Sequence, residues 1–150
     1  MNIDKTLLDT LLAEAAVNPR LRQNFDLRTT PADGSQRMLN AMLPGTVVPI
    51  HRHNKSTEVL VLLRGRMEQI FYEERPADAT GADGAIPLGT DVALRETRRV
   101  LLSADGPVMG QSIPVGQWHS VNVLEPTVIL ECKDGPFEPL APEDMVSPIV

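Results

Sequence analysis

The 150-residue sequence contains a single cysteine, Cys132, so it cannot form an internal disulfide bond. We interpret Cys132 as a small buried apolar residue of a strand, in a protein suited to a reducing compartment. The sequence also lacks an apolar run close to the roughly 20 residues that a membrane-spanning helix needs. Its N-terminus lacks the basic start and continuous apolar segment of a signal peptide. We therefore expect a cytoplasmic protein that does not bind a membrane.

Basic residues are few and dispersed along the chain. Lys and Arg number 14 against 20 Asp and Glu, which gives a net charge of −6. Such a surface repels phosphate backbones, so we expect no nucleic-acid partner. The aromatic content of 3% counts against a dedicated carbohydrate-binding surface, whereas the hydrophobic content of 42% is typical of one folded globular domain.

The N-terminal segment predicts one helix. Its leucines and alanines recur at helical spacing, Asp4 is suited to cap the first turn, and Asn18-Pro19 ends the pattern. A short turn or helix is expected over 20–24, followed by a loop at "TTPADGS". Residues 1–35 are therefore predicted to form a helical and loop extension that packs on the rest of the chain.

From Gln36 onward the pattern changes to short apolar segments separated by Gly, Pro or Asp. Five of them predict strands, at 36–42, 58–64, 67–73, 98–104 and 126–132. Residues 74–91 are expected to form a long, mobile polar connection, and the proline-rich tail 134–150 has no helix or strand signature. Because no helix separates the strands, a parallel α/β sheet is excluded. The sequence predicts an all-β sandwich or closed barrel over 36–150, with an extended C-terminal tail.

Two of the three histidines lie one residue apart in "GTVVPIHRHNKSTEVLVLLRG", residues 45–65. On a strand, His51 and His53 would point to the same side and Arg52 to the other. Glu58 follows after the turn-forming segment "NKST", and a strand that begins at Glu58 would return its carboxylate to the imidazoles.

The third histidine, His119, follows a predicted turn in "PVGQWH". Three imidazoles and one carboxylate suit a divalent transition metal, namely Fe, Mn, Ni, Co or Zn, and are unsuited to Cu(I) or an iron–sulfur cluster. We therefore predict His51, His53, Glu58 and His119 as metal ligands. In an octahedral complex, two positions would stay open for water or substrate.

These motifs resemble those of the cupin superfamily. "G(x5)HRH(x4)E(x6)G" matches the first cupin motif, and "PVGQWH" matches the centre of the second, although Val108 replaces its leading glycine and Asn122 stands one position early. The resemblance implies a double-stranded β-helix, or jelly-roll barrel, with the metal inside. The flanking segments "NPRLRQNFDLR" and "ECKDGPFEP" resemble those of WbuC-type cupin fold metalloproteins, which are associated with O-antigen and other surface-polysaccharide clusters.

Further residues are predicted from the alternation of their strands. Asn40 alternates with Met38 and Met42 and is predicted to reach the cavity, as is Gln111. Trp118 neighbours His119 and could stack on a sugar ring at the cavity mouth. We therefore predict Asn40, Gln111 and Trp118 as substrate-binding residues. Glu131 and Lys133 are expected to form a salt bridge with Arg37 or Arg52 and to have no catalytic role.

The resemblance leaves the reaction open, and three hypotheses follow. The first is an isomerase or epimerase that acts on an oxygen-rich small molecule, a sugar or sugar-derived acid, in surface-polysaccharide metabolism. No uncommitted histidine remains as its base, so the catalytic residue is unassigned. The second is an Fe(II)-dependent dioxygenase, and the third is a non-catalytic carbohydrate-binding or regulatory cupin. A homodimer is expected, since it would cover the sheet edges.

Overall fold

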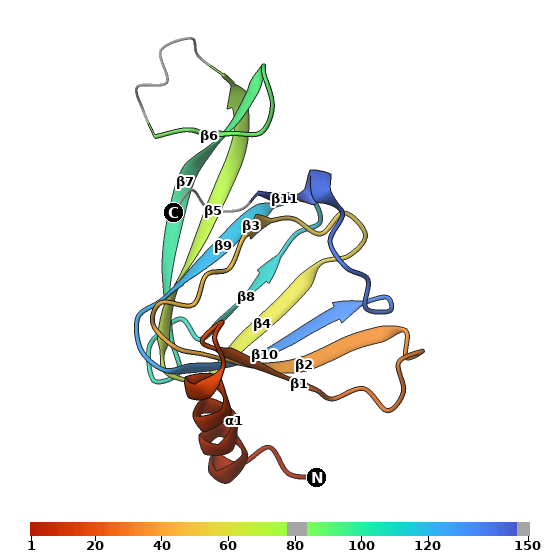
Figure 1. Ribbon diagram of the computed structural model, residues 1–150, viewed down its shortest axis with the longest axis vertical. Helices are drawn as coiled ribbons and strands as arrows, with labels where there is room; N and C mark the ends of the chain where they lie inside the picture. Colours follow the sequence, from red (N-terminus) through yellow and green to blue (C-terminus); the bar gives the residue numbers. More distant parts are fainter. Residues whose placement is uncertain (78–83, 147–150) are drawn as a thin grey trace.

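The computed structural model describes residues 1–77 and 84–146, which form two antiparallel sheets and an N-terminal helix (Figure 1). The five-stranded sheet has the order β1 (Arg22–Asp26), β2 (Ser35–Met42), β10 (Thr127–Asp134), β4 (Glu58–Arg64), β8 (Gly110–Ile113). The six-stranded sheet has the order β11 (Met145–Val146), β3 (Ile50–His51), β9 (Trp118–Val123), β5 (Arg66–Pro76), β7 (Val92–Ser103), β6 (Ile86–Pro87).

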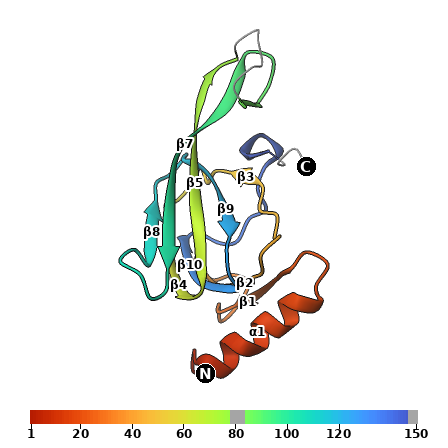
Figure 2. The ribbon, with the colours of Figure 1, turned by 90° about the vertical axis from the view of Figure 1, so that its left-hand side faces the viewer.

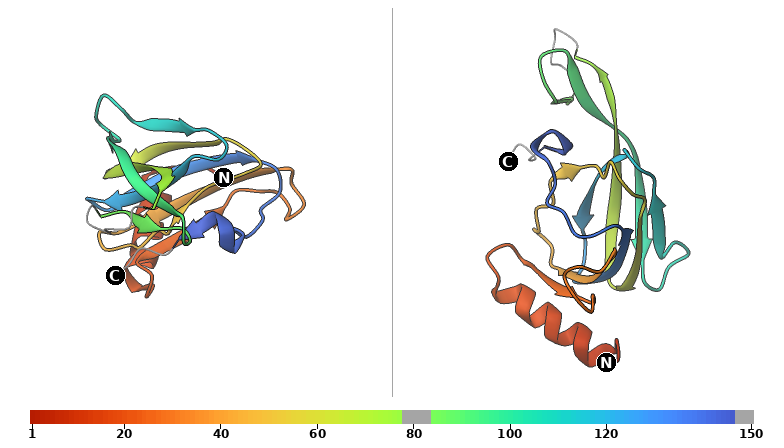
Figure 3. Two further views of the ribbon diagram at one scale, coloured as in Figure 1. Left: turned by 90° about the horizontal axis from the view of Figure 1, so that it is seen from above. Right: turned by 90° about the vertical axis from the view of Figure 1, so that its right-hand side faces the viewer.

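The two sheets face each other and curve around a shared interior (Figure 3). Apolar residues of both sheets form a core in this interior, among them Leu60 and Leu62 of β4, Met67 and Phe71 of β5, and Ile113 of β8. This arrangement confirms the predicted all-β jelly roll of the double-stranded β-helix type, with one N-terminal helix.

Helix α1 (Lys5–Val17) begins and ends at the predicted residues. The Asp4 side chain accepts a hydrogen bond from the Leu7 N–H at 3.0 Å, and Asn18 follows the last turn. The helix lies on the outer face of the five-stranded sheet, below β1 and β2 in Figure 2. Its contact with the sheet is an apolar cluster that includes Leu8, Leu11 and Ala15 of the helix with Leu39, Ala41 and Val128 of the sheet.

Three sequence predictions of local structure were wrong in whole or in part. Of the turn or helix expected over 20–24, Arg20 lies in a turn, but 22–24 belong to strand β1, whose antiparallel pairing with β2 outweighs the weak local signal. The tail contains a short 3-10 helix (Pro142–Asp144) and β11, which pairs with β3. Within 74–91, β5 continues to Pro76 and β6 follows, whereas 78–83 lie outside the described residues, as do 147–150 of the tail.

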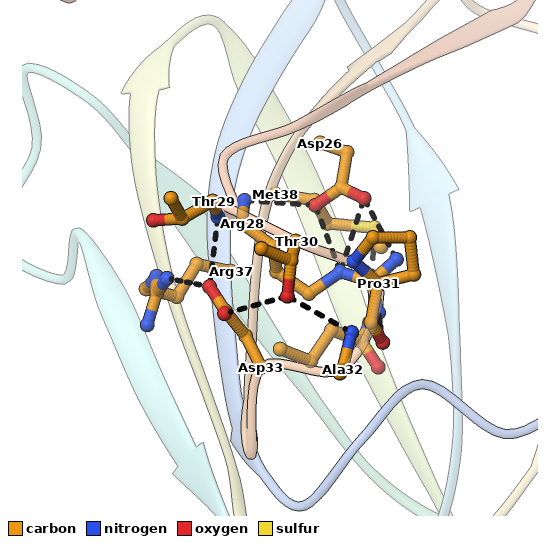
Figure 4. Close-up of polar contacts among 10 residues, drawn as sticks. Asp26, Arg28, Thr29, Thr30, Pro31, Ala32, Asp33, Arg37 and Met38 are labelled. Carbon is orange, nitrogen blue, oxygen red and sulfur yellow. Dashed lines mark hydrogen bonds and ion pairs between the residues drawn. The ribbon is translucent and has the colours of Figure 1, made fainter.

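The predicted loop between β1 and β2 is held by side-chain contacts of two aspartates (Figure 4). Asp33 accepts a hydrogen bond from the Thr29 N–H at 2.7 Å and pairs with Arg37 at 2.9 Å. Asp26 pairs with Arg28 at 2.7 Å. The guanidinium of Arg37 is therefore directed to this loop.

The reversal from β4 to β5 requires the predicted glycine. Gly65 has a φ of +82°, and a Cβ at this position would lie 2.2 Å from the carbonyl oxygen of Pro126. Beyond this turn, β5 and β7 form a long hairpin whose far end extends past the barrel (Figure 1). Among the described residues, no helix is long and apolar enough to cross a membrane.

Candidate metal centre

The three histidines and Glu58 come from both sheets and meet inside the barrel. His51 ends β3 and lies directly opposite His119 of β9 in the antiparallel register. Glu58 is the first residue of β4, in the facing sheet. The turn at Gly116, with a φ of +78°, donates its N–H to the His53 carbonyl at 2.9 Å and joins the two motifs. The 51–58 segment thus crosses from one sheet to the other.

The four side chains are close enough to share one ion. The ring centroids of His51 and His119 are 4.3 Å apart, and those of His51 and His53 are 5.0 Å apart. One ligand atom from each of these histidines and from Glu58 can be chosen so that all four lie within 4.8 Å of one another. Two ligands on opposite sides of an ion with bonds of about 2.1 Å would be about 4.2 Å apart, so the cluster is close to the required size.

Backbone carbonyls orient two of the rings. His51 Nδ1 lies 2.9 Å from the Pro49 oxygen, and His119 Nδ1 lies 2.8 Å from the Gln117 oxygen. A carbonyl can only accept, so each Nδ1 carries the hydrogen and each Nε2 lone pair is available to a metal. His53 differs, because its Nδ1 accepts a hydrogen bond from the Lys133 ammonium at 3.2 Å.

Two of the Nε2 atoms have no hydrogen-bond partner although they are buried. His119 Nε2 is one of them, and His53 Nε2 is the other. His53 Nε2 lies only 2.7 Å from Glu58 Oε2, yet the two atoms do not have the alignment of an N–H···O hydrogen bond. Buried polar atoms without a partner are destabilising, and ion coordination would satisfy both nitrogens and the carboxylate together.

The electrostatics of the cluster favour the protonation states that bind metal. Burial, followed by the charge of His119, lowers the pKa of His51 to about 4. Burial also lowers the pKa of His119. Burial alone would raise the pKa of Glu58, but the contact with His53 and the nearby imidazoles together lower it to about 2. At neutral pH, His51 and His119 are therefore neutral and Glu58 is ionised, as metal ligands must be.

A cavity of about 420 Å³ adjoins this cluster, within the range of small-molecule sites. Its wall includes inward-facing side chains of β2 and β10 as well as Arg22 of β1. Several buried polar atoms on this wall have no hydrogen-bond partner among the described residues, namely Arg22 Nε, Gln36 Oε1, Asn40 Oδ1 and Gln69 Oε1. Unpaired polar atoms that line an enclosed space are the groups that a polar ligand would satisfy.

Glu131 lies in the centre of this wall. It accepts hydrogen bonds from Gln36 Nε2 at 3.0 Å and from Asn40 Nδ2 at 2.9 Å. Burial, followed by the negative charge of Glu58, raises the pKa of Glu131 to about 7. A carboxyl with this pKa can both release and accept a proton near neutral pH.

The expected salt bridges of Glu131 and Lys133 with Arg37 or Arg52 are not formed. Arg37 pairs with Asp33, and Arg52 pairs with Glu74 at 2.9 Å and Asp144 at 2.8 Å. Sequence reasoning missed Glu131 because alternation along β10 does not show which face of the strand is the interior. Leu130 and Val128 pack towards α1, which leaves Glu131 and Lys133 inside.

The three predicted substrate-binding residues lie in different places. Asn40 lines the cavity, between Met38 and Met42 on the same face of β2. Gln111 of β8 pairs with Leu60 and has a buried, unpartnered Oε1, but it is not among the residues that line this cavity. Trp118 also lies outside the cavity lining.

Trp118 is only 3% exposed, so its ring faces are covered. It packs in an apolar cluster with Ile50 and Tyr72. Its ring lies 4.5 Å from the Arg52 guanidinium, and its Nε1 donates to Glu74 at 2.9 Å.

Solved structures with a similar fold belong to proteins of different activities. An oxalate oxidase in complex with the substrate analogue glycolate aligns with a TM-score of 0.55 and 15% identity over 93% of this chain. The capsular polysaccharide assembling protein CapF from Staphylococcus aureus aligns with a TM-score of 0.54 and 18% identity over 87% of this chain. An L-ribose isomerase from Acinetobacter sp. DL28, in complex with L-ribose, aligns with a TM-score of 0.51 and 23% identity over 76% of this chain.

This chain spans 64%, 30% and 59% of those three proteins, respectively, so it corresponds to less than two thirds of each. At these identities the likeness establishes the cupin-like fold and no activity. No curated protein matches the sequence. A family model does match, over residues 3–80, which include His51, His53 and Glu58. The chain therefore belongs to the family described as a domain of unknown function, DUF6016.

Proposed function

We propose that this protein is a divalent-metal-dependent cupin in which His51, His53, Glu58 and His119 hold the ion and the adjacent cavity takes an oxygen-rich small molecule. The observation that supports this best is the pair of buried, unpartnered Nε2 atoms beside an ionised carboxylate. Three nitrogens and one oxygen suit Fe(II), Mn(II), Co(II), Ni(II) or Zn(II).

We propose isomerisation or epimerisation of a sugar or sugar-derived acid as the reaction. A divalent ion in this site would polarise a carbonyl oxygen and so acidify the adjacent C–H bond. The group that the sequence left unassigned is then a base, and Glu131 fits that role because it lines the same cavity and titrates near neutral pH. In isomerisation it would take the proton from carbon and return it at the neighbouring carbon, while the hydroxyl proton passes to the former carbonyl oxygen. In epimerisation the planar intermediate would have to turn over in the cavity before the same carboxyl returns the proton to its other face.

Gln36 and Asn40 would position this base. Both donate their side-chain N–H groups to Glu131, one to each carboxyl oxygen, and so hold the carboxyl plane in one orientation. Glu131 pairs directly with Leu60 across β10 and β4, so Glu58 is its diagonal neighbour. Diagonal Cα atoms on adjacent antiparallel strands are about 7–8 Å apart, so the base and the ion would lie on the same wall of the cavity, within reach of one small ligand.

The test begins with the metal content of freshly purified protein and continues with proton exchange. The Zn, Mn and Fe forms are incubated with pentoses, hexoses and hexuronates in D₂O, and loss of the α-proton signal is followed by NMR. We expect exchange with at least one substrate, and a decrease of about 100-fold or more in Glu131→Gln with metal content unchanged. Glu125→Gln, an exposed residue paired with Arg66, is the matched control.

Failure of all metal forms to exchange any probe would exclude the isomerase proposal. Oxygen uptake by the iron form alone would instead identify a dioxygenase, and ligand binding without turnover would identify a binding or regulatory cupin. Metal-free protein that takes up none of these ions would exclude the metal centre itself.

We further propose that the protein is of the WbuC type, acts in surface-polysaccharide metabolism and forms a homodimer. Support for the dimer comes from the outer face of β4, where Val59 and Val61 are 44% and 37% exposed, beside the edge strand β8. Light scattering coupled to size-exclusion chromatography tests it, and a monomeric mass at high protein concentration would exclude it.

A further inference from the structure

The cavity wall opposite the six-stranded sheet carries a cation that forms no ion pair and is attracted to the carboxyl of Glu131 only at longer range. Arg22 of β1 is partly buried, lines the cavity, and has an Nε that makes no hydrogen bond. Among the described residues, no carboxylate lies within ion-pair distance of its guanidinium. A guanidinium that is largely removed from water normally has an acidic group in direct contact, because its desolvation is costly. We infer that an anionic ligand supplies the direct ion-pair partner that Arg22 lacks.

Beside this cation, the wall offers hydrogen-bond acceptors. Gln36 and Asn40 use their N–H groups to bind Glu131, so their oxygens, Oε1 and Oδ1, are the atoms left without partners. Such oxygens require donors, and hydroxyl groups of a ligand are suitable. A carboxylate for Arg22 and hydroxyls for the two amide oxygens together describe a polyhydroxy acid.

The charges of the cavity point the same way. Its lining contains two cations, Arg22 and Lys133, against two anions, Glu58 and Glu131. Glu138 also lines it but pairs with Lys55 at 2.5 Å. A divalent ion at the histidines would leave an excess of two positive charges, and more when Glu131 is protonated. A neutral sugar leaves this excess uncompensated, whereas a monoanionic sugar acid reduces it.

The placement of Arg22 also bears on ligand size. The sheet order is β1, β2, β10, β4, so Arg22 lies three strands from Glu58. Arg22 pairs with Met42, whereas Glu58 is level with Gln36, six residues away along β2. At about 4.8 Å per strand and about 3.3 Å per residue, the two backbone positions are about 14 Å apart across the strands and about 20 Å apart along them, a separation that the curvature of the sheet and the long Arg22 side chain shorten. A ligand that reaches both Arg22 and the metal residues is therefore longer than a two-carbon acid such as glycolate.

We propose that the substrate class is a polyhydroxy monocarboxylate of sugar size, with its carboxylate at Arg22 and its hydroxyls at Gln36 and Asn40. This rests on the proposed function for the metal end of the cavity. The recognition at Arg22 itself needs no metal, and this property separates the two proposals experimentally.

The test compares matched acid and neutral probes. Binding of galacturonate and galactose, and of gluconate and glucitol, is measured by saturation-transfer NMR and calorimetry on the Zn(II)-loaded protein and on chelator-treated protein. We expect each acid to bind at least tenfold more tightly than its neutral partner, and glycolate to bind more weakly than either acid. Arg22→Gln should lower the affinity for the acids at least tenfold and change that for the neutral probes less than twofold.

Two further variants keep the test decisive. Arg20→Gln removes an exposed positive charge close to Arg22 but outside the cavity lining, and should leave both affinities within twofold. Arg22→Lys keeps the charge and should retain part of the preference for acids, so a folding defect of the glutamine variant does not obscure the result.

Equal affinity for acid and neutral probes, or an unchanged preference in Arg22→Gln, overturns the inference, as does binding of none of the probes. Loss of zinc binding with a preserved, Arg22-dependent preference for acids overturns the metal centre and leaves the anion subsite standing. Zinc binding without any preference for acids supports the metal centre and overturns the anion subsite.

Discussion

The two faces of strand β2 differ in what they contact. On the outer face, Leu39 and Ala41 are fully buried against α1. On the inner face, Gln36 and Asn40 are equally buried but line a cavity and leave one oxygen each unpaired. The apolar side of this strand thus points away from the barrel interior, and a polar side points into it.

This difference separates residues that stabilise the fold from residues that serve a ligand. Apolar burial against α1 contributes favourably in the protein as it stands. Each buried oxygen without a partner instead costs about 1–3 kcal/mol, which the fold alone does not offset at that position. The inner face is therefore explained by the ligand that it would bind.

The largest expected effect on stability lies on the outer face. Leu11 is 2% exposed in the apolar cluster between helix and sheet, so Leu11→Ala should lower the free energy of unfolding by about 3 kcal/mol through lost burial and a cavity. Zinc affinity should stay within twofold. Denaturant unfolding and chelator competition measure the two quantities. Thr10→Ala, on the exposed side of the helix, is the control, and a large loss of zinc affinity in Leu11→Ala would contradict the separation of the faces.

The next effect lies at the metal end of the cavity. His119→Gln keeps a polar side chain of similar length but removes an imidazole whose Nε2 is directed to the cluster. Affinity for zinc, measured by competition with a chromophoric chelator, should fall about 100-fold or more, because one of four ligands is lost. Asn122→Ala, an exposed position on the same strand, should leave it unchanged. A decrease of less than tenfold would mean that the ion binds elsewhere.

A third test concerns the pH dependence caused by Glu131. Burial raises its folded-state pKa to about 7, whereas the unfolded carboxyl titrates at about 4.5. Between these values the folded protein holds a proton that the unfolded chain releases, so stability falls as pH rises and levels off above about 7. Relative to Glu131→Gln, metal-free wild type should lose about 2 kcal/mol between pH 5 and pH 8.

Urea unfolding of both proteins at several pH values measures this difference. Bound zinc should reduce it, because a nearby divalent cation favours the ionised carboxyl and lowers its pKa. A wild type that gains stability over this range relative to the glutamine variant would show that Glu131 is already ionised at pH 5.

Much of the metal end could be predicted from sequence, because its residues follow local rules. The one-residue spacing of His51 and His53 fixes a common face on an extended segment, and glycine-containing turns position His119 and the β4–β5 reversal. The cavity wall could not be predicted in this way. Arg22 was assigned to a turn or helix, although pairing with Met42 of β2 makes it part of a strand.

Glu131 was assigned to the wrong environment for a related reason. Alternation along β10 shows that Leu130 and Glu131 face opposite sides, but it does not show which side is the interior. Only the position of α1 decides this, since the helix covers the side on which Leu130 lies. That contact joins residues far apart in the sequence, and no local pattern encodes it.

The smallest effect is expected at Lys133, where the polar wall meets the metal end. Its ammonium donates to His53 Nδ1 at 3.2 Å, which leaves the ring hydrogen of a neutral imidazole on Nε2, the atom that a metal would need. Metal uptake must therefore break this contact and also overcome the repulsion between the ammonium and the cation.

Lys133→Gln removes the charge and provides a side-chain oxygen that can accept a hydrogen bond from the Nδ1–H of His53. Zinc affinity should rise about tenfold. Lys55→Gln removes an exposed charge nearby and should change it little, whereas weaker zinc binding in Lys133→Gln would show that the lysine supports the site.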